Sequence, residues 1–137
     1  MADIPSPTQI RDLMPLAVLI GIELLEAGPE LVRGRIAWSP ERCTTGGVLH
    51  GGTVMALGDT CGAVCAFLNL PEGATGTTTI ESKTNFLRAV RDGAITATTR
   101  PLHRGRTLIV VESEIAREDG TLAAKVTQSQ AFQYPRA

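Results

Sequence analysis

Residues 51–70 form the segment that most constrains the fold of this chain. Asp59 is the only charged side chain between Arg42 and Glu72, and it lies within a run of small and apolar residues. The run predicts one long helix, from about residue 51 to residue 68, with little surface exposed to water. A carboxylate on such a helix is costly unless something pairs with it or uses it. Asp59 is therefore the first candidate for chemistry.

The same segment is long enough to be tested as a membrane span. Besides Asp59 it contains Asn69, several glycines and few large aliphatic side chains, and a long strand-rich region follows it. The pair Gly58 and Gly62 would suit helix dimerisation in a membrane, but it equally lets a soluble helix approach a sheet closely. We therefore expect the buried helix of a soluble domain, and no membrane partner.

Strand patterns occupy most of the remaining sequence. A short helix is expected within residues 8–20, broken near Pro15. Turn signals and apolar runs predict six strands, at residues 23–27, 31–38, 77–87, 94–102, 107–116 and 122–132. The length of 137 residues suits one domain, which we assign to residues 1–137 with residues 1–19 as an N-terminal helical segment. One long helix with about six antiparallel strands defines the α+β class.

The composition argues against several kinds of partner. A net charge of −1 and an aromatic content of 4% offer neither a basic field nor a stacking platform for nucleic acid. The three cysteines have no second ligand pair nearby, which favours structural thiols in a reducing compartment over a disulfide framework or a metal site. The first residues lack the pattern of a signal peptide, so we expect a cytoplasmic protein.

The direction of Asp59 follows from helix geometry. At about 100° per residue, one arc of the helix gathers the residues suited to pack on the sheet: Val54, Leu57, Gly58, Cys61, Cys65 and Leu68. Asp59 lies nearly opposite, on a second small and apolar face that we expect to include Met55, Gly62, Ala63 and Ala66. A helix that is apolar on both faces is buried on both, so a second subunit or a ligand should cover this face. In the alternative, Asp59 is a structural acid paired with Arg88, Arg91 or Lys83.

The start of the helix carries a second candidate feature. Gly47, Gly51 and Gly52 flank His50 where the helix begins. Free N–H groups and the positive end of the helix dipole favour a developing oxyanion there, and glycine lets a ligand approach the backbone. His50 could instead act only as a helix cap or a packed polar residue. Asp59 follows about two and a half turns along the same helix, which favours the catalytic interpretation.

These residues resemble a known family. The motifs are residues 47–52 (GVLHGG), 56–59 (ALGD), 85–89 (NFLRA) followed by Gly93, and 105–107 (GRT) leading a long strand. Together they resemble the hotdog-fold thioesterases, in particular the PaaI-like (phenylacetic acid degradation) branch of acyl-CoA thioesterases. The resemblance covers roughly residues 20 to 133.

The resemblance implies a fold, an assembly and a set of roles. The fold is a long central helix wrapped by a curved antiparallel sheet, and two subunits join their sheets so that active sites form at their interface. Asp59 would act on a thioester carbonyl as general base or nucleophile, the Gly51 N–H would polarise the carbonyl oxygen, and His50 would help to position it. Thr44 stands where the family usually has Asn or Gln, and Thr77 matches a hydroxyl residue that often holds the attacking water.

Further expectations concern coenzyme A and the assembly. Phosphate groups need basic side chains around the pocket. The resemblance points to Gly52, Arg88, Arg106 and Thr107 as substrate or CoA contacts, although solvated arginines at strand ends are an equal alternative for each basic residue. Weaker candidates are Lys83, His103 and Arg104. CoA would be part of the substrate, so no cofactor is expected. A homotetramer built from two hotdog dimers is the expected assembly, because such relatives are often tetramers.

The function expected from these features is hydrolysis of a small aryl or medium-chain acyl-CoA thioester to the free acid and CoA. Two alternatives remain open. The first is a non-catalytic acyl-CoA-binding module, which Thr44 in place of Asn or Gln would favour. The second is an enoyl-CoA hydratase or dehydratase of the same fold, since such enzymes also pair a histidine with an acid.

Overall fold

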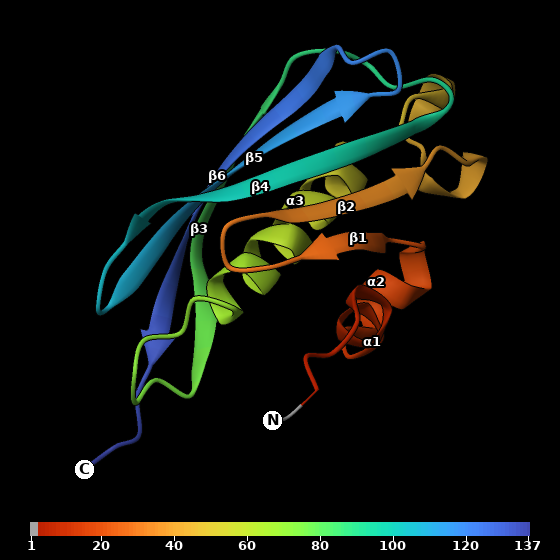
Figure 1. Cartoon of the computed structure of the whole chain (residues 1–137). Helices are drawn as coiled ribbons and strands as arrows, with labels where there is room; N and C mark the ends of the chain where they lie inside the picture. Colours follow the sequence, from red (N-terminus) through yellow and green to blue (C-terminus); the bar gives the residue numbers. More distant parts are fainter. Residues whose placement is uncertain (1–2) are drawn as a thin grey trace.

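A long helix packed against one face of a six-stranded antiparallel sheet dominates the computed structural model, which describes residues 3–137 (Figure 1). The helix is α3 (Gly51–Phe67). The strands are β1 (Glu23–Ala27), β2 (Val32–Ala37), β3 (Gly76–Phe86), β4 (Ala94–Arg104), β5 (Leu108–Arg117) and β6 (Leu122–Gln133). Their order in the sheet is β1-β2-β4-β5-β6-β3. This is the arrangement expected for a hotdog fold.

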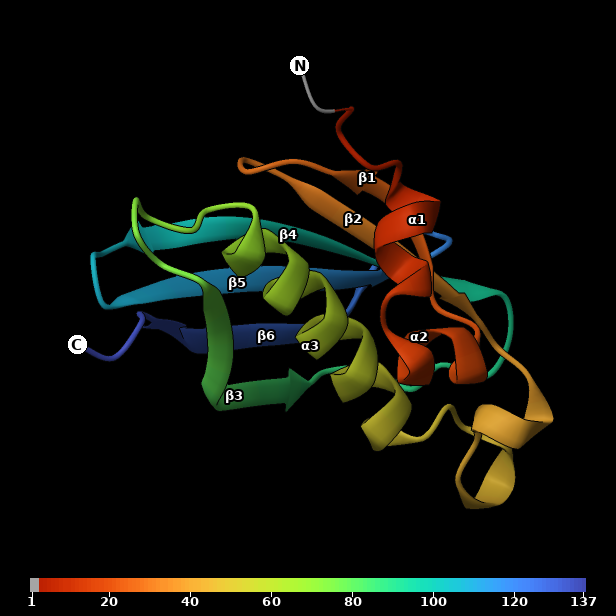
Figure 2. The same cartoon turned by 90° about the horizontal axis from the view of Figure 1, so that it is seen from below.

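Two short helices precede the sheet. They are α1 (Pro7–Asp12) and α2 (Pro15–Ile20), and both begin with a proline, which suits the first turn of a helix. The predicted break at Pro15 is confirmed. Figure 2 shows both helices beside β1, on the side of the sheet that also carries α3. The connection between β2 and α3 contains two 3-10 turns, Pro40–Arg42 and Thr45–Gly47.

The sheet has one long open edge. β3 pairs with β6 along most of its length, and no strand of residues 3–137 lies on its other side. The pairing shifts between Thr79 and Glu81, where Ile80 has no direct partner on β6 and is 60% exposed. The opposite edge is β1, which has only five residues. β3 is therefore the edge most open to pairing with another strand.

Glycines bring α3 close to the sheet. A Cβ on Gly58 would lie 2.8 Å from Val126 Cγ2, and one on Gly62 would lie 1.7 Å from Gln128 Oε1. On the sheet side, a Cβ on Gly34 of β2 would lie 2.5 Å from the Cys61 sulfur. The interpretation of Gly58 and Gly62 as allowing close approach to a sheet is confirmed. Among residues 3–137, no helix is long and apolar enough to cross a bilayer.

The predicted core face of α3 is largely correct. Val54, Leu57, Gly58, Cys61 and Cys65 are buried, and burial raises the pKa of the Cys61 thiol to about 12 and that of Cys65 to about 11. Two residues expected beside Asp59, Gly62 and Ala66, are already buried within a single chain. At Gly62 the helix approaches β6 closely, since a Cβ there would meet Gln128. Asp59, Met55 and Ala63 remain on the open side, Ala63 being half-buried.

A methyl group added at Gly58 tests this close approach. We expect Gly58→Ala to lower the free energy of unfolding by about 1–3 kcal/mol, because the core around Val126 cannot move freely. In a Val126→Ala background, where the atom it would meet is gone, the same change should instead stabilise, since alanine favours the helix. Urea denaturation of the four proteins measures both effects. A stabilising Gly58→Ala in the wild-type background would contradict the packing.

Candidate active site

The N-terminus of α3 is capped by the His50 ring. His50 has extended backbone angles, and its Nδ1 accepts a hydrogen bond of 2.8 Å from the Gly52 N–H. Nδ1 is thus the acceptor nitrogen, which leaves the ring proton on Nε2 in the neutral side chain. The N–H groups of Thr53 and Val54 donate to the His50 carbonyl. His50 therefore does cap the helix.

The cap leaves one donor free. Within residues 3–137, no group accepts a hydrogen bond from the Gly51 N–H. By contrast, Gly52, which was expected to contact substrate, has its N–H bound to His50. A Cβ on Gly51 would lie 3.3 Å from the Phe86 ring, a tight contact. The first turn of α3 thus offers a single unsatisfied N–H at the positive end of the helix dipole.

Gly51 lines an apolar groove of about 370 Å³. The groove lies between the start of α3 and the end of β3, and its lining includes Thr44, Gly51, Val54, Phe86, Leu87 and Arg88. Its volume and apolar walls suit a small ligand. Thr44 is exposed, and its N–H donates to the Val48 carbonyl at 2.8 Å, so this residue of the loop is held at the groove. The structure therefore brings Thr44, Gly51 and Arg88 together.

Asp59 lies further along α3 and forms no ion pair within the part of the chain that is described. Thr79 Oγ1 donates to its Oδ1 at 3.0 Å, and Gln128 Nε2 donates to the same oxygen. The alternative of a structural pair with Arg88, Arg91 or Lys83 is wrong, since none of the three forms an ion pair with Asp59. Arg88 donates to the Leu122 carbonyl and Arg91 to the Gly46 carbonyl. Asp59 is an exposed carboxylate held by neutral donors.

The hydroxyl beside the acid belongs to Thr79 and not to Thr77. Thr77 Oγ1 donates to Gln130 Oε1 at 2.6 Å, and Gln130 Nε2 donates to Thr79 Oγ1 at 2.6 Å. Three hydrogen bonds, through Gln130 and Thr79, thus connect Thr77 to Asp59. The sequence reasoning missed both glutamines of β6, although they stand at alternate positions of an otherwise apolar strand face, which is a readable signal.

Asp59 and Gly51 of one chain do not meet. Eight residues of helix separate them, which corresponds to about 12 Å along the axis. One thioester carbonyl cannot contact both at hydrogen-bonding distance. The two halves of the predicted site are therefore present in each chain but lie apart.

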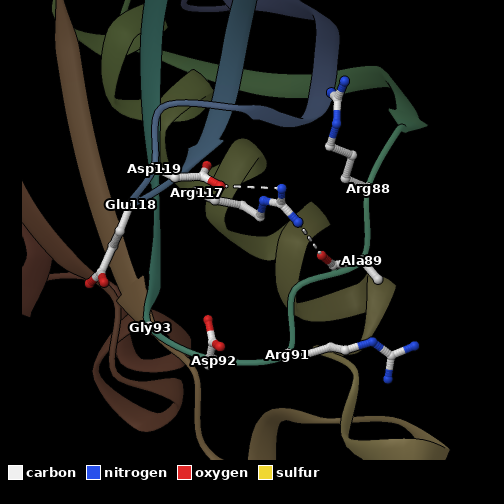
Figure 3. Close-up of a pocket in the computed structure, with 8 residues that line it drawn as sticks. All are labelled: Arg88, Ala89, Arg91, Asp92, Gly93, Arg117, Glu118 and Asp119. Carbon is white, nitrogen blue, oxygen red and sulfur yellow. Dashed lines mark hydrogen bonds and ion pairs between the residues drawn. The ribbon is translucent and has the colours of Figure 1, made fainter.

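The basic residues expected around CoA fall into two separate places. Arg88 borders the groove and also a neighbouring open pocket of about 690 Å³. Figure 3 shows Arg117 extending across this second pocket towards the Ala89 carbonyl, to which it donates, while Arg88 and Arg91 extend away. Hydrogen bonds from Thr121 hold the pKa of Asp119 below its ordinary value, with Arg117 adding to the effect.

Arg106 and Thr107 lie at the other end of β6. They line a pocket of about 470 Å³ with Pro71, Glu72 and Tyr134. The Thr107 carbonyl accepts from Phe132 near the end of β6, whereas the Arg88 N–H donates to Ala123 near its start. Nine residues of strand correspond to about 30 Å, so Arg88 and Arg106 line no common pocket in one chain. Of the weaker candidates, Arg104 is paired with Glu30.

The fold is a long helix on a six-stranded antiparallel sheet. An acid lies on the open side of that helix, and a free N–H lies at its start. Together these features define a hotdog-fold protein of the hydrolase type. A family model described as the thioesterase superfamily matches residues 46–124. The chain belongs to the thioesterase superfamily, a family of thioester hydrolases. Its place in the PaaI-like branch stays a prediction.

Individual relatives agree with this assignment. A protein of Saccharolobus solfataricus that carries "esterase" in its name is 38% identical over 105 residues, which cover 77% of this chain and 72% of the relative. The crystal structure of a thioesterase from Haemophilus influenzae has a TM-score of 0.89 at 25% identity, covering 96% of this chain and 93% of that one. A Streptococcus pneumoniae protein described as a hypothetical thioesterase, solved with coenzyme A, shares the fold, with a TM-score of 0.74 at 22% identity over 85% of this chain and 88% of its own.

Proposed function

We propose that this protein is an acyl-CoA thioesterase that hydrolyses a small aryl or medium-chain acyl-CoA thioester to the free acid and CoA. The observation that carries the proposal is the Gly51 N–H, which has no acceptor within residues 3–137 and borders an apolar groove. The carboxylate of Asp59, held on the open side of the same helix, supplies the second group. The coenzyme A bound to the Streptococcus pneumoniae thioesterase supports the choice of CoA thioesters.

The active site is completed by a second copy of the chain. β3 is a long, unpaired edge, and Ile80 and Phe86 on it are more than half exposed. Antiparallel pairing of β3 with its copy would lay the Phe86 and Gly51 end of one subunit beside the Gly76 end of the other. Asp59 is tied to that end by Thr79. The smallest active unit is then a dimer, and two such dimers form the expected tetramer.

The chemistry follows from the two groups. The Gly51 N–H donates to the thioester oxygen and stabilises the negative charge that develops there, aided by the dipole of α3. The His50 Nε2–H helps to position the carbonyl region. Asp59 of the partner subunit takes a proton from water as the water oxygen adds to the carbonyl carbon. The C–S bond then breaks, and CoA leaves as a thiolate that regains a proton. In the nucleophilic variant, the carboxylate adds to the carbonyl carbon, the C–S bond breaks with release of the CoA thiolate, and water then cleaves the resulting anhydride.

The remaining candidates surround these groups. Thr44 offers a hydroxyl in the groove beside Gly51, and Thr77 supports Thr79 through Gln130. Arg88 borders the groove, where it can meet phosphate groups of CoA. Arg106 and Thr107 of the partner subunit reach the same region only through the antiparallel pairing of β3. The reaction needs no cofactor, because CoA enters as part of the substrate.

A panel of aryl, short-chain and long-chain acyl-CoA thioesters tests the proposal. Purified protein should release free thiol from at least one small aryl or medium-chain member. Saturable binding of CoA thioesters without thiol release from any member would contradict hydrolysis and favour a binding module, the role that Thr44 would fit. Loss of enoyl-CoA absorbance without thiol release would instead indicate a hydratase.

A further inference from the structure

Two glutamines of β6 lie buried beneath α3, close to Asp59. We propose that Gln128 is a positioning residue that fixes the Asp59 carboxylate for hydrolysis, and that Gln130 supports it through Thr79. The inference rests on the proposed function and deepens it. Neither glutamine borders the groove beside Gly51, so both act only through the acid.

The sequence of β6 makes these glutamines unusual. The strand face that packs under α3 consists of Ala124, Val126, Gln128, Gln130 and Phe132. Both glutamines are 1% exposed, as deeply buried as the valine next to them. Buried amides are costly unless their polar atoms are bonded. Two of them in succession on a core face therefore call for a physical reason.

Their hydrogen bonds converge on one carboxylate oxygen. Gln128 Nε2 donates directly to Asp59 Oδ1, and Gln130 Nε2 donates to Thr79 Oγ1, which donates to the same Oδ1. An ionised carboxylate only accepts, so the Gln128 amide nitrogen must face it. No donor within residues 3–137 reaches Oδ2. The arrangement holds one oxygen and leaves the other free to meet water or the thioester.

The buried Gln128 side chain has one polar atom without a hydrogen bond from any described residue. Its Oε1 is buried without a hydrogen-bond donor from residues 3–137. Room for that atom exists only because residue 62 is glycine, since a Cβ there would lie 1.7 Å away. An apolar side chain would leave no buried acceptor unsatisfied. Glutamine at position 128 thus keeps the contact with Asp59, although an apolar side chain there would make the core more stable.

A series of three glutamine-to-methionine variants separates positioning from folding. Methionine has a similar length and no amide donor. Gln133 provides the matched control, because it lies on the same strand and donates to Thr78 Oγ1, away from Asp59. We expect Gln128→Met to lower kcat at least about tenfold with little change in KM, since a poorly placed reacting group slows chemistry without altering the groove. Gln130→Met should cost less, and Gln133→Met should have no effect.

The Tm of Gln128→Met distinguishes a positioning role of Gln128 from a purely structural one. If Gln128 were merely structural, Tm would fall together with kcat. The positioning role predicts an unchanged or raised Tm, because the unpaired Oε1 disappears. A Gln128→Met variant with the kcat of Gln133→Met, in an active wild-type background, would overturn the inference.

A second measurement does not depend on activity. Gln128→Met and Asp59→Ala remove the same hydrogen bond, so their effects on the unfolding equilibrium should be non-additive. Additive effects would overturn the contact itself. A wild-type protein that hydrolyses no thioester would overturn the proposed function, and the positioning role with it, while the coupling would still report whether Gln128 and Asp59 interact.

Discussion

We expect the Asp59→Asn variant to lose at least about a hundredfold in kcat for thiol release, the usual effect of removing a general base. Asparagine can still accept hydrogen bonds from Thr79 and Gln128 through its carbonyl oxygen, but it neither takes a proton from water nor attacks a carbonyl. The fold should be unaffected, because Asp59 is exposed and forms no ion pair within residues 3–137. Steady-state kinetics and thermal unfolding measure the two effects separately.

Two companion variants sharpen this experiment. Glu26→Gln removes another exposed carboxylate, on β1, and should leave kcat unchanged. Asp59→Ala should be as inactive as Asp59→Asn but less stable, because the buried Gln128 amide then loses its acceptor. Turnover by Asp59→Asn at the wild-type rate would remove Asp59 from the mechanism.

The second large effect is expected at Gly51. Gly51→Pro removes the N–H at the start of α3 that is unpaired within residues 3–137, and we expect kcat to fall by about 10²–10³, as for the loss of an oxyanion donor. Proline suits the first position of a helix. The preceding residue, His50, already has φ −61° and ψ 136°, which are angles that a residue before proline adopts. The helix should therefore survive the change.

Gly51→Ala is the matched control for this variant. It adds a Cβ against the Phe86 ring, as proline does, but it keeps the N–H. Phe86 is more than half exposed and can yield by a few tenths of an ångström. We expect Gly51→Ala to retain most of the wild-type kcat. Equal losses in the two variants would mean that crowding of the groove, and not the missing donor, limits the reaction.

Local sequence patterns were sufficient to predict the elements of the fold. The apolar run with its glycine start predicts α3, and β1 was predicted with the bounds Glu23–Ala27 that it has. The structure shortens the predicted strand at residues 31–38 by one residue at each end, to Val32–Ala37. Alternation and turn signals are properties of consecutive residues, so they can be recognised in a single sequence.

Contacts between distant elements were harder to predict. Thr77 and Thr79 share one face of β3, and only the crossing of α3 over the sheet decides which of them meets Asp59. The same crossing buries Gly62, which helix geometry had placed beside the acid. Neither the crossing angle nor the pairing of β3 with β6 is encoded within one segment.

The residues of the candidate site likewise divide into those that local sequence patterns reveal and those whose role depends on distant contacts. His50, Gly51 and Asp59 are recognisable because each breaks a local rule: a charge on an apolar helix, or glycines and a histidine at a helix start. Gln128 and Gln130 break one too, as polar residues on a buried strand face, but their meaning depends on a helix nearly 70 residues away in the sequence. The proposed meeting of Gly51 with Asp59 requires a second chain.

Subunit complementation tests the central claim, that Asp59 works with Gly51 of the partner subunit. Asp59→Asn and Gly51→Pro chains, each inactive alone, are co-expressed with different tags, and the mixed oligomer is purified through both tags. In a mixed dimer, one site contains both changes and the other contains none. We predict that mixed dimers recover about half of the wild-type kcat per dimer. Mixed dimers as inactive as either parent would place both groups in a site within one chain and contradict the account.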